Sequence, residues 1–303
     1  MTFATRVIRF LDEKKKKGVE DRPDLENDSP GVLASRLVSI YGGSKDQWRI
    51  GKPLASSLYS ACMRMHVIGT VLGRDRVSSV SAGDRVTYSI GDALHYWAQN
   101  TPVFFGDRRV GYWWCLACRK VIFGRVPTGK CSCGAHHDVF RYQEHSLNLD
   151  GDYPVTGHPD LFLERRPRVF RLLELKSIDG DAFLTLKAPL VEHEWQVITY
   201  LWGCSQDKTL PVSIQSDYAY VLYFSKKKVV KEFPVKAFPV KQNPMILGAV
   251  TRKLAIYKKG MENYPASVPP VDEQCLTTNW GCWIAKSCAV KNDCQNLATV
   301  RMR

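Results

Sequence analysis

The sequence predicts an α/β fold in which a mixed sheet is flanked by helices, and two patterns carry this prediction. Apolar runs, alternating or continuous, indicate strands at 140–149, 155–164, 168–177, 218–224 and 229–235. Apolar residues at helical spacing indicate helices at 90–100, 190–203 and 243–262. Because strands that alternate with helices are typical of α/β proteins, we expect a core sheet with helices on its faces.

The chain of 303 residues is long enough to bury a sizeable core, and we divide it into two parts. Residues 1–45 are predicted to be a charged, helical extension, and 46–303 to be the main domain. The segment before the first predicted strand, 31–100, is expected to be mainly helical. Within the main domain, 106–138 is rich in cysteines and aromatic residues and is interpreted as an insertion, whereas 275–298 is a cysteine-rich tail.

Composition points to the class of partner and to the compartment. The formal net charge is +13 and the pI is about 9.3. Such a balance favours polyanions, most simply nucleic acid, although a basic surface without a specific partner is also compatible with it. No apolar stretch reaches the length of a membrane span, and the charged N-terminus does not resemble a signal peptide, so we expect a cytoplasmic protein with no membrane partner. Ten cysteines in a reducing compartment indicate metal binding.

Two acids and a lysine are placed by the pattern on adjacent strands. Asp160 is placed at the end of one apolar strand-like run, and Glu174-Leu175-Lys176 at the end of the next. Because side chains alternate along a strand, Glu174 and Lys176 are expected on one face. A hairpin at 165–167 would set Asp160 beside Glu174, where two carboxylates could hold a hard divalent ion close to the lysine. This combination suits cleavage of a phosphodiester.

Four sequence elements in order resemble the RecB-like exonuclease branch of the PD-(D/E)XK nucleases. Gly91 to His95 resembles its histidine-bearing helix, and Gly157-His158-Pro159-Asp160 resembles its Gly-x-x-Asp element. Glu174-x-Lys176 is similar to its catalytic strand, and Gln196-x-x-x-Tyr200 to the helix that follows. Close relatives of this pattern are the AddB nuclease domains and the small CRISPR-associated iron–sulphur exonucleases.

The resemblance implies a restriction-endonuclease-like fold and a set of roles. His95, Asp160 and Glu174 would hold Mg²⁺ or Mn²⁺, with the nitrogen ligand shifting the preference toward Mn²⁺. Lys176 would orient or deprotonate the attacking water and stabilise charge on the phosphate. Gln196 would position that water or a phosphate, with Tyr200 beside it. The implied activity is metal-dependent hydrolysis of DNA, from single-stranded ends, in recombination, repair or end processing.

Other interpretations of the same residues stay open. Taken singly, His95 and Tyr200 are each explained by packing of a helix, and Glu144 resembles an acid often found in the family without being assigned a role here. A non-catalytic DNA-binding or recombination accessory protein that keeps the fold is the alternative function. A redox or radical iron–sulphur enzyme is disfavoured, because the chain has neither a C-x3-C-x2-C run nor a Gly-rich dinucleotide loop. A P-loop is also absent, so a helicase motor would be a separate partner.

The first cysteine cluster predicts a structural metal site. Its spacing, C-x2-C followed by C-x-C, gives two knuckles that suit a tetrahedral zinc, as in a zinc ribbon. The tight second knuckle leaves open that His136 or His137 replaces a sulphur. Nearby tryptophans could stack on bases or pack the insertion equally well. The predicted ligands are Cys115, Cys118, Cys131 and Cys133.

The second cluster resembles the iron–sulphur staple of the same nucleases, in which one early cysteine joins three C-terminal ones. The segment 56–64 resembles their early element, and the implied [4Fe–4S] ligands are Cys62, Cys282, Cys288 and Cys294, with Cys275 in reserve. The spacing departs from the family pattern, because Met63 stands where proline is usual and Ala285 where the middle cysteine is expected. Zinc bound by the C-terminal cysteines alone, with Cys62 merely buried, is the alternative.

A basic stretch after the catalytic strands predicts a path for the DNA backbone. An excess of lysine and arginine over acids between 221 and 263 would contact phosphates, with weak sequence preference. The residues assigned to this surface are Lys226, Lys227, Lys228, Arg252 and Lys253.

Overall fold

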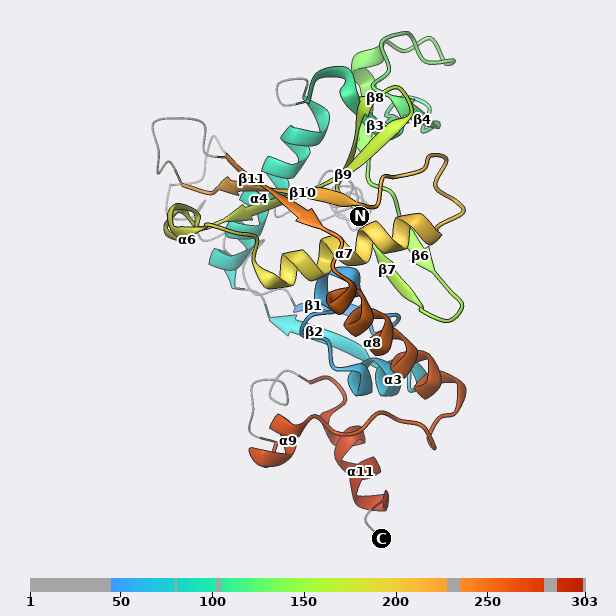
Figure 1. Ribbon diagram of the computed structural model, residues 1–303, viewed down its shortest axis with the longest axis vertical. Coiled ribbons are helices and arrows are strands. Elements are labelled where there is room, and N and C mark those ends of the chain that lie inside the picture. The colour runs from blue at the N-terminus through green and yellow to red at the C-terminus, as the bar shows by residue number, and fades with distance from the viewer. Residues whose placement is uncertain (1–44, 80, 102–104, 228–234, 281–287, 302–303) are drawn as a thin grey trace, which may run out of the picture.

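The computed structural model describes residues 45–79, 81–101, 105–227, 235–280 and 288–301. The predicted N-terminal extension therefore lies almost wholly outside the described residues. So do Lys228, Cys282 and nearly all of the strand expected at 229–235. Figure 1 shows an elongated molecule, with strands β3 (Arg109–Cys115) and β4 (Val121–Arg125) at one end and helices α9 (Glu273–Thr277) and α11 (Lys291–Arg301) at the other.

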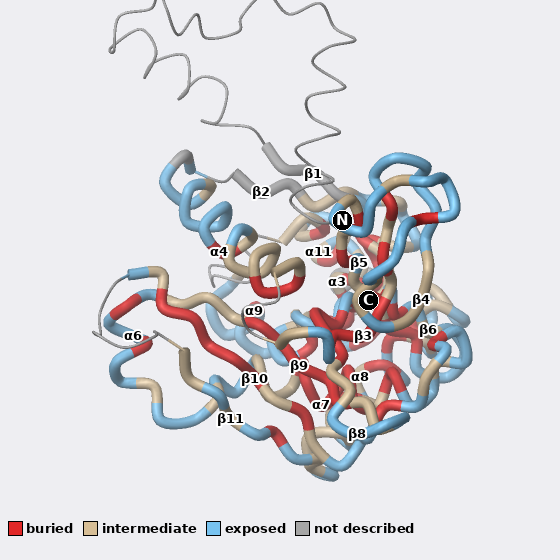
Figure 2. The backbone as a smooth tube through the Cα atoms, turned by 90° about the horizontal axis from the view of Figure 1, so that it is seen from above, coloured by how far each residue is buried: buried red, intermediate tan, exposed pale blue. Residues whose placement is uncertain are grey.

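A seven-stranded mixed sheet forms the centre of the described chain, in the order β11-β10-β9-β8-β3-β4, with β5 also paired to β3. Only the pair β9–β10 is parallel among these ladders, so the sheet is mostly antiparallel. Figure 2 shows how deeply its middle strands are buried. The remaining bounds are β5 (Phe140–Gln143), β8 (Leu161–Arg166), β9 (Val169–Ile178), β10 (Tyr218–Ser225) and β11 (Val235–Lys241).

Alternation along β9 divides the protein into two cores, one on each face of the sheet. Leu173 and Leu175 join the core that packs against helix α4 (Ala82–Asn100). Glu174 and Lys176 point to the opposite face, which is covered by helix α7 (Val191–Gln206). The predicted flanking of the sheet by helices is thus confirmed.

Local sequence explains where the long helices begin. Ser81 and Asp84 form a capping box at the start of α4, and Asn243 caps helix α8 (Pro244–Glu262), which has its proline at the first position. Helix α7 has no side-chain cap of its own. Instead, the Leu190 N–H that precedes it donates to the buried Tyr223 hydroxyl at 3.0 Å, which fastens the start of α7 to the sheet.

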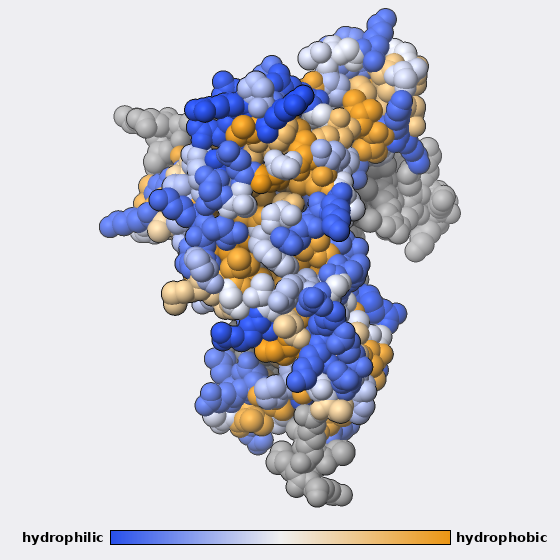
Figure 3. Space-filling model, turned by 45° about the vertical axis from the view of Figure 1, so that its right-hand side comes forward, coloured by the Kyte–Doolittle hydropathy of each residue, from blue (hydrophilic) through white to orange (hydrophobic). Residues whose placement is uncertain are grey.

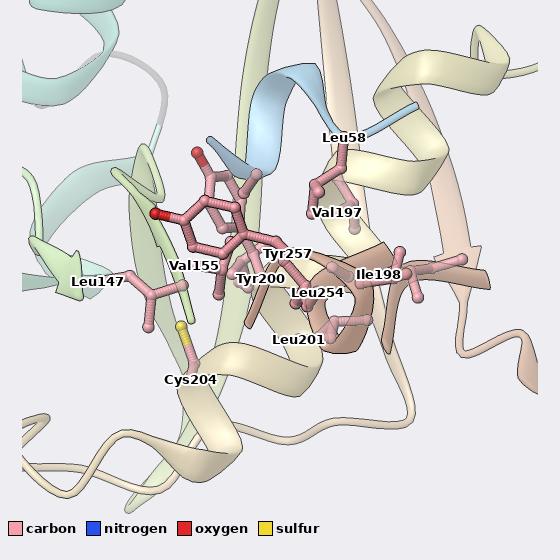
Figure 4. Packing of buried hydrophobic residues seen from close by; sticks show 14 of the residues in the cluster. Leu58, Leu147, Val155, Val197, Ile198, Tyr200, Leu201, Cys204, Leu254 and Tyr257 are labelled. Atoms are coloured by element: carbon pink, nitrogen blue, oxygen red, sulfur yellow. The ribbon is translucent and has the colours of Figure 1, made fainter. Parts of the chain in front are cut away.

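Several of the remaining elements pack against helix α7. Helix α8 packs on α7 and on helix α3 (Met63–Val71). Figure 4 shows buried residues of this core, among them Leu201 of α7 and Leu254 of α8. Two short ladders complete this part, β1 (Lys45–Arg49) with β2 (Asp75–Ser79) and β6 (Leu147–Leu149) with β7 (Val155–Gly157). Short helical turns lie at η1 (Ala55–Ser57), η2 (Gly106–Arg108), η3 (His137–Val139) and α6 (Gly180–Thr185).

Two expectations need correction. Residues 45–49 and 75–79 form strands, although the segment 31–100 was expected to be mainly helical. The strand expected at 140–149 is two strands, β5 and β6, which belong to different sheets.

The stretch 106–138, interpreted as an insertion, contributes to the central sheet, because β3 pairs with β8 and with β5.

Within the described residues, no helix combines the length and apolar character that a bilayer crossing needs. On the face drawn in Figure 3, apolar patches are interrupted by hydrophilic side chains.

Candidate active site

The site lies where strand β8 begins and its neighbour β9 runs on past it. Leu161, the first residue of β8, pairs with Leu173, so beyond that point this edge of β9 has no strand partner among the described residues. Asp160 fills the gap: its Oδ2 accepts the Leu175 N–H at 2.7 Å. The hairpin predicted at 165–167 is confirmed, and it places Asp160 and Glu174 on adjacent segments.

Glu174, Lys176 and Gln196 meet on the α7 face of the sheet. Glu174 is 1% exposed, and its Oε1 accepts hydrogen bonds from Lys176 Nζ at 2.6 Å and Gln196 Nε2 at 2.8 Å. Its second oxygen, Oε2, is buried without a hydrogen-bond partner. Because a buried carboxylate oxygen without a partner costs free energy, this atom is one that a cation would satisfy.

Helix α4 reaches the site from the other face. His95 Nδ1 lies 3.5 Å from Asp160 Oδ1. One turn later, Gln99 Nε2 donates to the Asp160 carbonyl at 3.0 Å and to Glu144 Oε1 at 2.9 Å. Gln99 was missed by sequence reasoning, although its spacing of four residues from His95 places both on one helix face. Glu144, which had no role assigned, lies in this network.

Burial and mutual repulsion control the charges of the acids. Burial, followed by the charge of Asp160, raises the pKa of Glu174 to about 8 and that of Glu144 to about 7. For Asp160, burial acts in the same upward direction, but His95, Lys176 and the Leu175 N–H outweigh it and hold the pKa below its ordinary value. Asp160 therefore carries the negative charge of the metal-free cluster at neutral pH.

Lys176 and His95 respond to these acids. Burial opposes the charged form of Lys176, but Glu174 and Asp160 outweigh it and raise its pKa. In His95, burial again favours the neutral ring, and Asp160 reverses the balance so that the pKa is raised. Lys176 is thus a charged donor at neutral pH.

Gly157 explains why a glycine opens the Gly-x-x-Asp element. A Cβ at this position would lie 2.7 Å from Tyr200 Cε1 and 3.2 Å from Ala55 Cβ. The Tyr200 hydroxyl accepts the His158 N–H at 3.2 Å and contacts Gln196 Nε2 at 3.3 Å. Tyr200 therefore links the turn that carries Asp160 to helix α7, whose Gln196 donates to Glu174.

We expect Gly157→Ala to destabilise the fold by about 1–3 kcal/mol, because the added methyl group overpacks the contact with Tyr200. Urea denaturation followed by circular dichroism would measure the change. Gly248→Ala is the matched control, because Gly248 is exposed on α8 and a Cβ there meets nothing within 4 Å. Equal stability of the two variants would contradict the role given to the Gly157–Tyr200 contact.

The four cysteines of the first cluster are brought together as predicted. Their sulphur atoms all lie within 4.8 Å of one another, which could hold a metal such as zinc or iron. Each knuckle closes on a left-handed residue, Arg119 at φ 63° and Gly134 at φ 87°. His136 and His137 are not in this group, and their rings lie against each other at 4.0 Å. Trp113 is 2% exposed and packs in the core, so it offers no face for base stacking.

Among the described residues, no other group of three or more potential ligands is equally tight. His95, Asp160 and Glu174 do not close to that spacing. One Glu174 oxygen, Oε1, is instead hydrogen-bonded to Lys176 and Gln196.

The tail cysteines approach the predicted early ligand. Cys288 and Cys294 both act electrostatically on Cys62, whose pKa is raised, first by burial. Arg64, 3% exposed, fastens this region by donating to Cys294 Sγ at 2.9 Å and to the Pro269 carbonyl at 2.6 Å. Cys275 is buried against Val271 and Trp280, which also pack on the main core that contains Cys294.

The basic residues assigned to a DNA path differ in their surroundings. The Lys253 ammonium donates to the carbonyls of Leu58 at 2.8 Å and Tyr59 at 2.9 Å, so it stabilises the segment before Cys62. Lys227 pairs with Asp179 at 2.8 Å, and Arg252 is exposed on α8. The charge excess therefore contains structural lysines.

Comparisons with known proteins add little. No family model and no curated protein matches the chain. The solved structure of SSO0001 aligns at 16% sequence identity and a TM-score of 0.25, over 49% of this chain and 55% of SSO0001. The chain thus spans about half the length of SSO0001, and a likeness at this TM-score carries no argument. What is established is a mixed α/β fold with a mostly antiparallel sheet and a four-cysteine group that could hold a metal.

Proposed function

We propose that this protein is a metal-dependent deoxyribonuclease of the RecB-like PD-(D/E)XK class, on a restriction-endonuclease-like sheet. It would hydrolyse phosphodiester bonds of DNA from single-stranded ends. The observation that carries the proposal is the buried meeting of His95, Asp160, Glu174, Lys176 and Gln196 from separate segments. The unpartnered Glu174 Oε2 supports a cation there.

The residues present fit a hard divalent ion. Asp160 and Glu174 offer oxygens, and His95 a nitrogen, which suits Mg²⁺ or Mn²⁺. When bound, such an ion would polarise a phosphate oxygen and lower the pKa of a water molecule. Glu174 would offer Oε2 to the ion, because Oε1 already accepts from Lys176 and Gln196.

The remaining chemistry falls to the side chains around the acids. Lys176, held protonated by Glu174 and Asp160, would donate to the attacking water and to the phosphate, where negative charge develops. Gln196 would fix the orientation of Glu174 through its amide. Gln99 would hold the Asp160 turn from behind, through the backbone carbonyl.

We expect Mn²⁺ binding to tighten as the pH rises toward 8 and to level off above it, because the ion must displace a proton from Glu174 and, where the ring is charged, another from His95. The sign follows from the pKa of about 8 in the metal-free protein: below it Glu174 is neutral and binding releases a proton. Calorimetry in buffers of different ionisation enthalpy would count the protons. An affinity independent of pH between 6 and 8 would contradict the assignment of Glu174.

Two further metal groups complete the proposal. Zinc would occupy the group Cys115, Cys118, Cys131 and Cys133 as a structural ion with no open position. A [4Fe–4S] cluster would join Cys62, Cys288 and Cys294 with Cys282, a residue outside the described part of the chain. Iron–sulphur ligands are separated by the width of the cluster, so they need not meet the tight spacing of a single-ion site.

The test is a cleavage assay with the anaerobically purified full chain. End-labelled single and double strands would be incubated with Mg²⁺ or Mn²⁺, with EDTA as the metal-free control and a circular single strand as the substrate without ends. We expect digestion of linear single strands only when metal is present. If the protein binds DNA without cleaving it, the nuclease proposal is overturned and the non-catalytic DNA-binding alternative is favoured.

A further inference from the structure

A tyrosine and a histidine lie beside Lys176 and take no part in the site described above. Tyr223 stands directly opposite Lys176 in the parallel ladder of β9 and β10, so the two side chains share a face of the sheet. Tyr223 is completely buried, and its hydroxyl lies 2.8 Å from His193 Nδ1. His193 is on the same face of α7 as Gln196 and Tyr200, three and seven residues further along.

The hydrogen bonds of Tyr223 determine which ring nitrogen of His193 carries the proton. The hydroxyl oxygen accepts the Leu190 N–H at 3.0 Å. The hydroxyl hydrogen has no acceptor other than His193 Nδ1 among the described residues, and a fully buried hydroxyl does not leave its hydrogen unpaired. His193 therefore accepts at Nδ1 and carries its proton on Nε2.

The resulting ring is a neutral donor directed away from Tyr223. Burial, followed by the charge of Lys176, lowers the pKa of His193 to about 4, so the ring stays neutral in the physiological range. Its Nε2 finds no acceptor in the described part of the chain, and it is not among the buried atoms without a partner, so solvent reaches it. A fixed donor that is exposed beside a lysine is suited to an anionic oxygen.

We propose that His193, held by Tyr223, donates its Nε2–H to a non-bridging oxygen of the DNA phosphate next to the one at Lys176. The inference rests on the proposed function and deepens it, because it adds a substrate contact to the same site. A neutral donor would bind that phosphate without competing with Lys176 for Glu174. The contact would place the strand on the α7 side of the acids.

The test measures affinity for a single-stranded oligonucleotide, with Ca²⁺ in place of Mg²⁺, together with kcat and KM for cleavage. We expect His193→Ala to weaken binding by about tenfold, the loss of one hydrogen bond to a charged group, while kcat changes much less. His193→Gln keeps a neutral N–H donor and should restore most of the affinity. Tyr223→Phe, which removes only the hydroxyl, should fall between them, and Val191→Ala on the exposed face of α7 is the matched control.

A second readout identifies the phosphate. Single methylphosphonates, which are uncharged, would be placed along the strand; in the wild type one position next to the cleaved bond should weaken binding, and in His193→Ala that position should lose its effect. An unchanged methylphosphonate pattern, or wild-type affinity in His193→Ala, would overturn this inference while leaving the nuclease intact. A wild-type protein that neither binds nor cleaves DNA would instead remove the proposed function and this inference with it.

Discussion

Lys176→Ala is expected to slow DNA cleavage by about a thousandfold, because it removes the charged donor at the place where phosphate charge develops. DNA affinity should stay nearly unchanged, since most of it comes from phosphate contacts along the strand. Single-turnover cleavage of an end-labelled single strand, with Mn²⁺ saturating, would measure the rate, and binding in Ca²⁺ would measure the affinity. Asp160→Ala should have an effect of similar size, because it removes a ligand of the proposed ion; it also leaves the Leu175 N–H without its acceptor.

The matched control is Lys208→Ala, an exposed lysine in the loop after α7. It removes the same charge and should cleave at the wild-type rate. Lys176→Ala also leaves Glu174 with one donor, Gln196, so melting curves must show that the variant folds. Near wild-type cleavage by folded Lys176→Ala protein would reject the nuclease proposal.

Sequence patterns predicted those parts of the fold in which hydrophobic alternation dominates. The hairpin of β8 and β9 and the helices α7 and α8 are found where apolar residues recur at the strand or helix period. The ladder of β1 and β2 was missed, because its strands, KDQWR and DRVSS, are mostly polar and have no apolar alternation. Their pairing depends on residues about thirty positions apart, which a local pattern does not contain.

The same limit applies to the site. Asp160, Glu174, Lys176 and Gln196 could be named because each stands at a fixed spacing within a motif. Glu144 and His193 could not be assigned roles in this way. Tertiary packing alone brings Glu144 to Gln99 and His193 to Tyr223. A count of charges likewise does not distinguish a lysine on the surface from one, such as Lys253, that donates to backbone carbonyls.

The second prediction with a large expected effect concerns the cysteine-rich tail. We expect anaerobically prepared protein to be brown and to contain iron, sulphide and about one zinc per chain. Cys288→Ala should lose the colour and the iron, keep the zinc, and lower stability by a few kcal/mol, because the cluster closes a loop from Cys62 to Cys294. Metal analysis, visible absorption and thermal melting would follow these changes.

The contacts of Arg64 limit how far the tail should detach when the cluster is lost. Arg64 binds the Cys294 sulphur and the Pro269 carbonyl without any metal, so the tail should stay near α3 in Cys288→Ala and become only partly accessible to protease. Cys275→Ala tests the reserve ligand: it should leave the colour unchanged if Cys62 is the fourth ligand. If the anaerobic protein contains two zinc ions and no iron, the iron–sulphur assignment is rejected. Colour retained in Cys62→Ala but lost in Cys275→Ala would transfer the fourth ligand to Cys275, and the tail would then be held to α3 by Arg64 and packing alone.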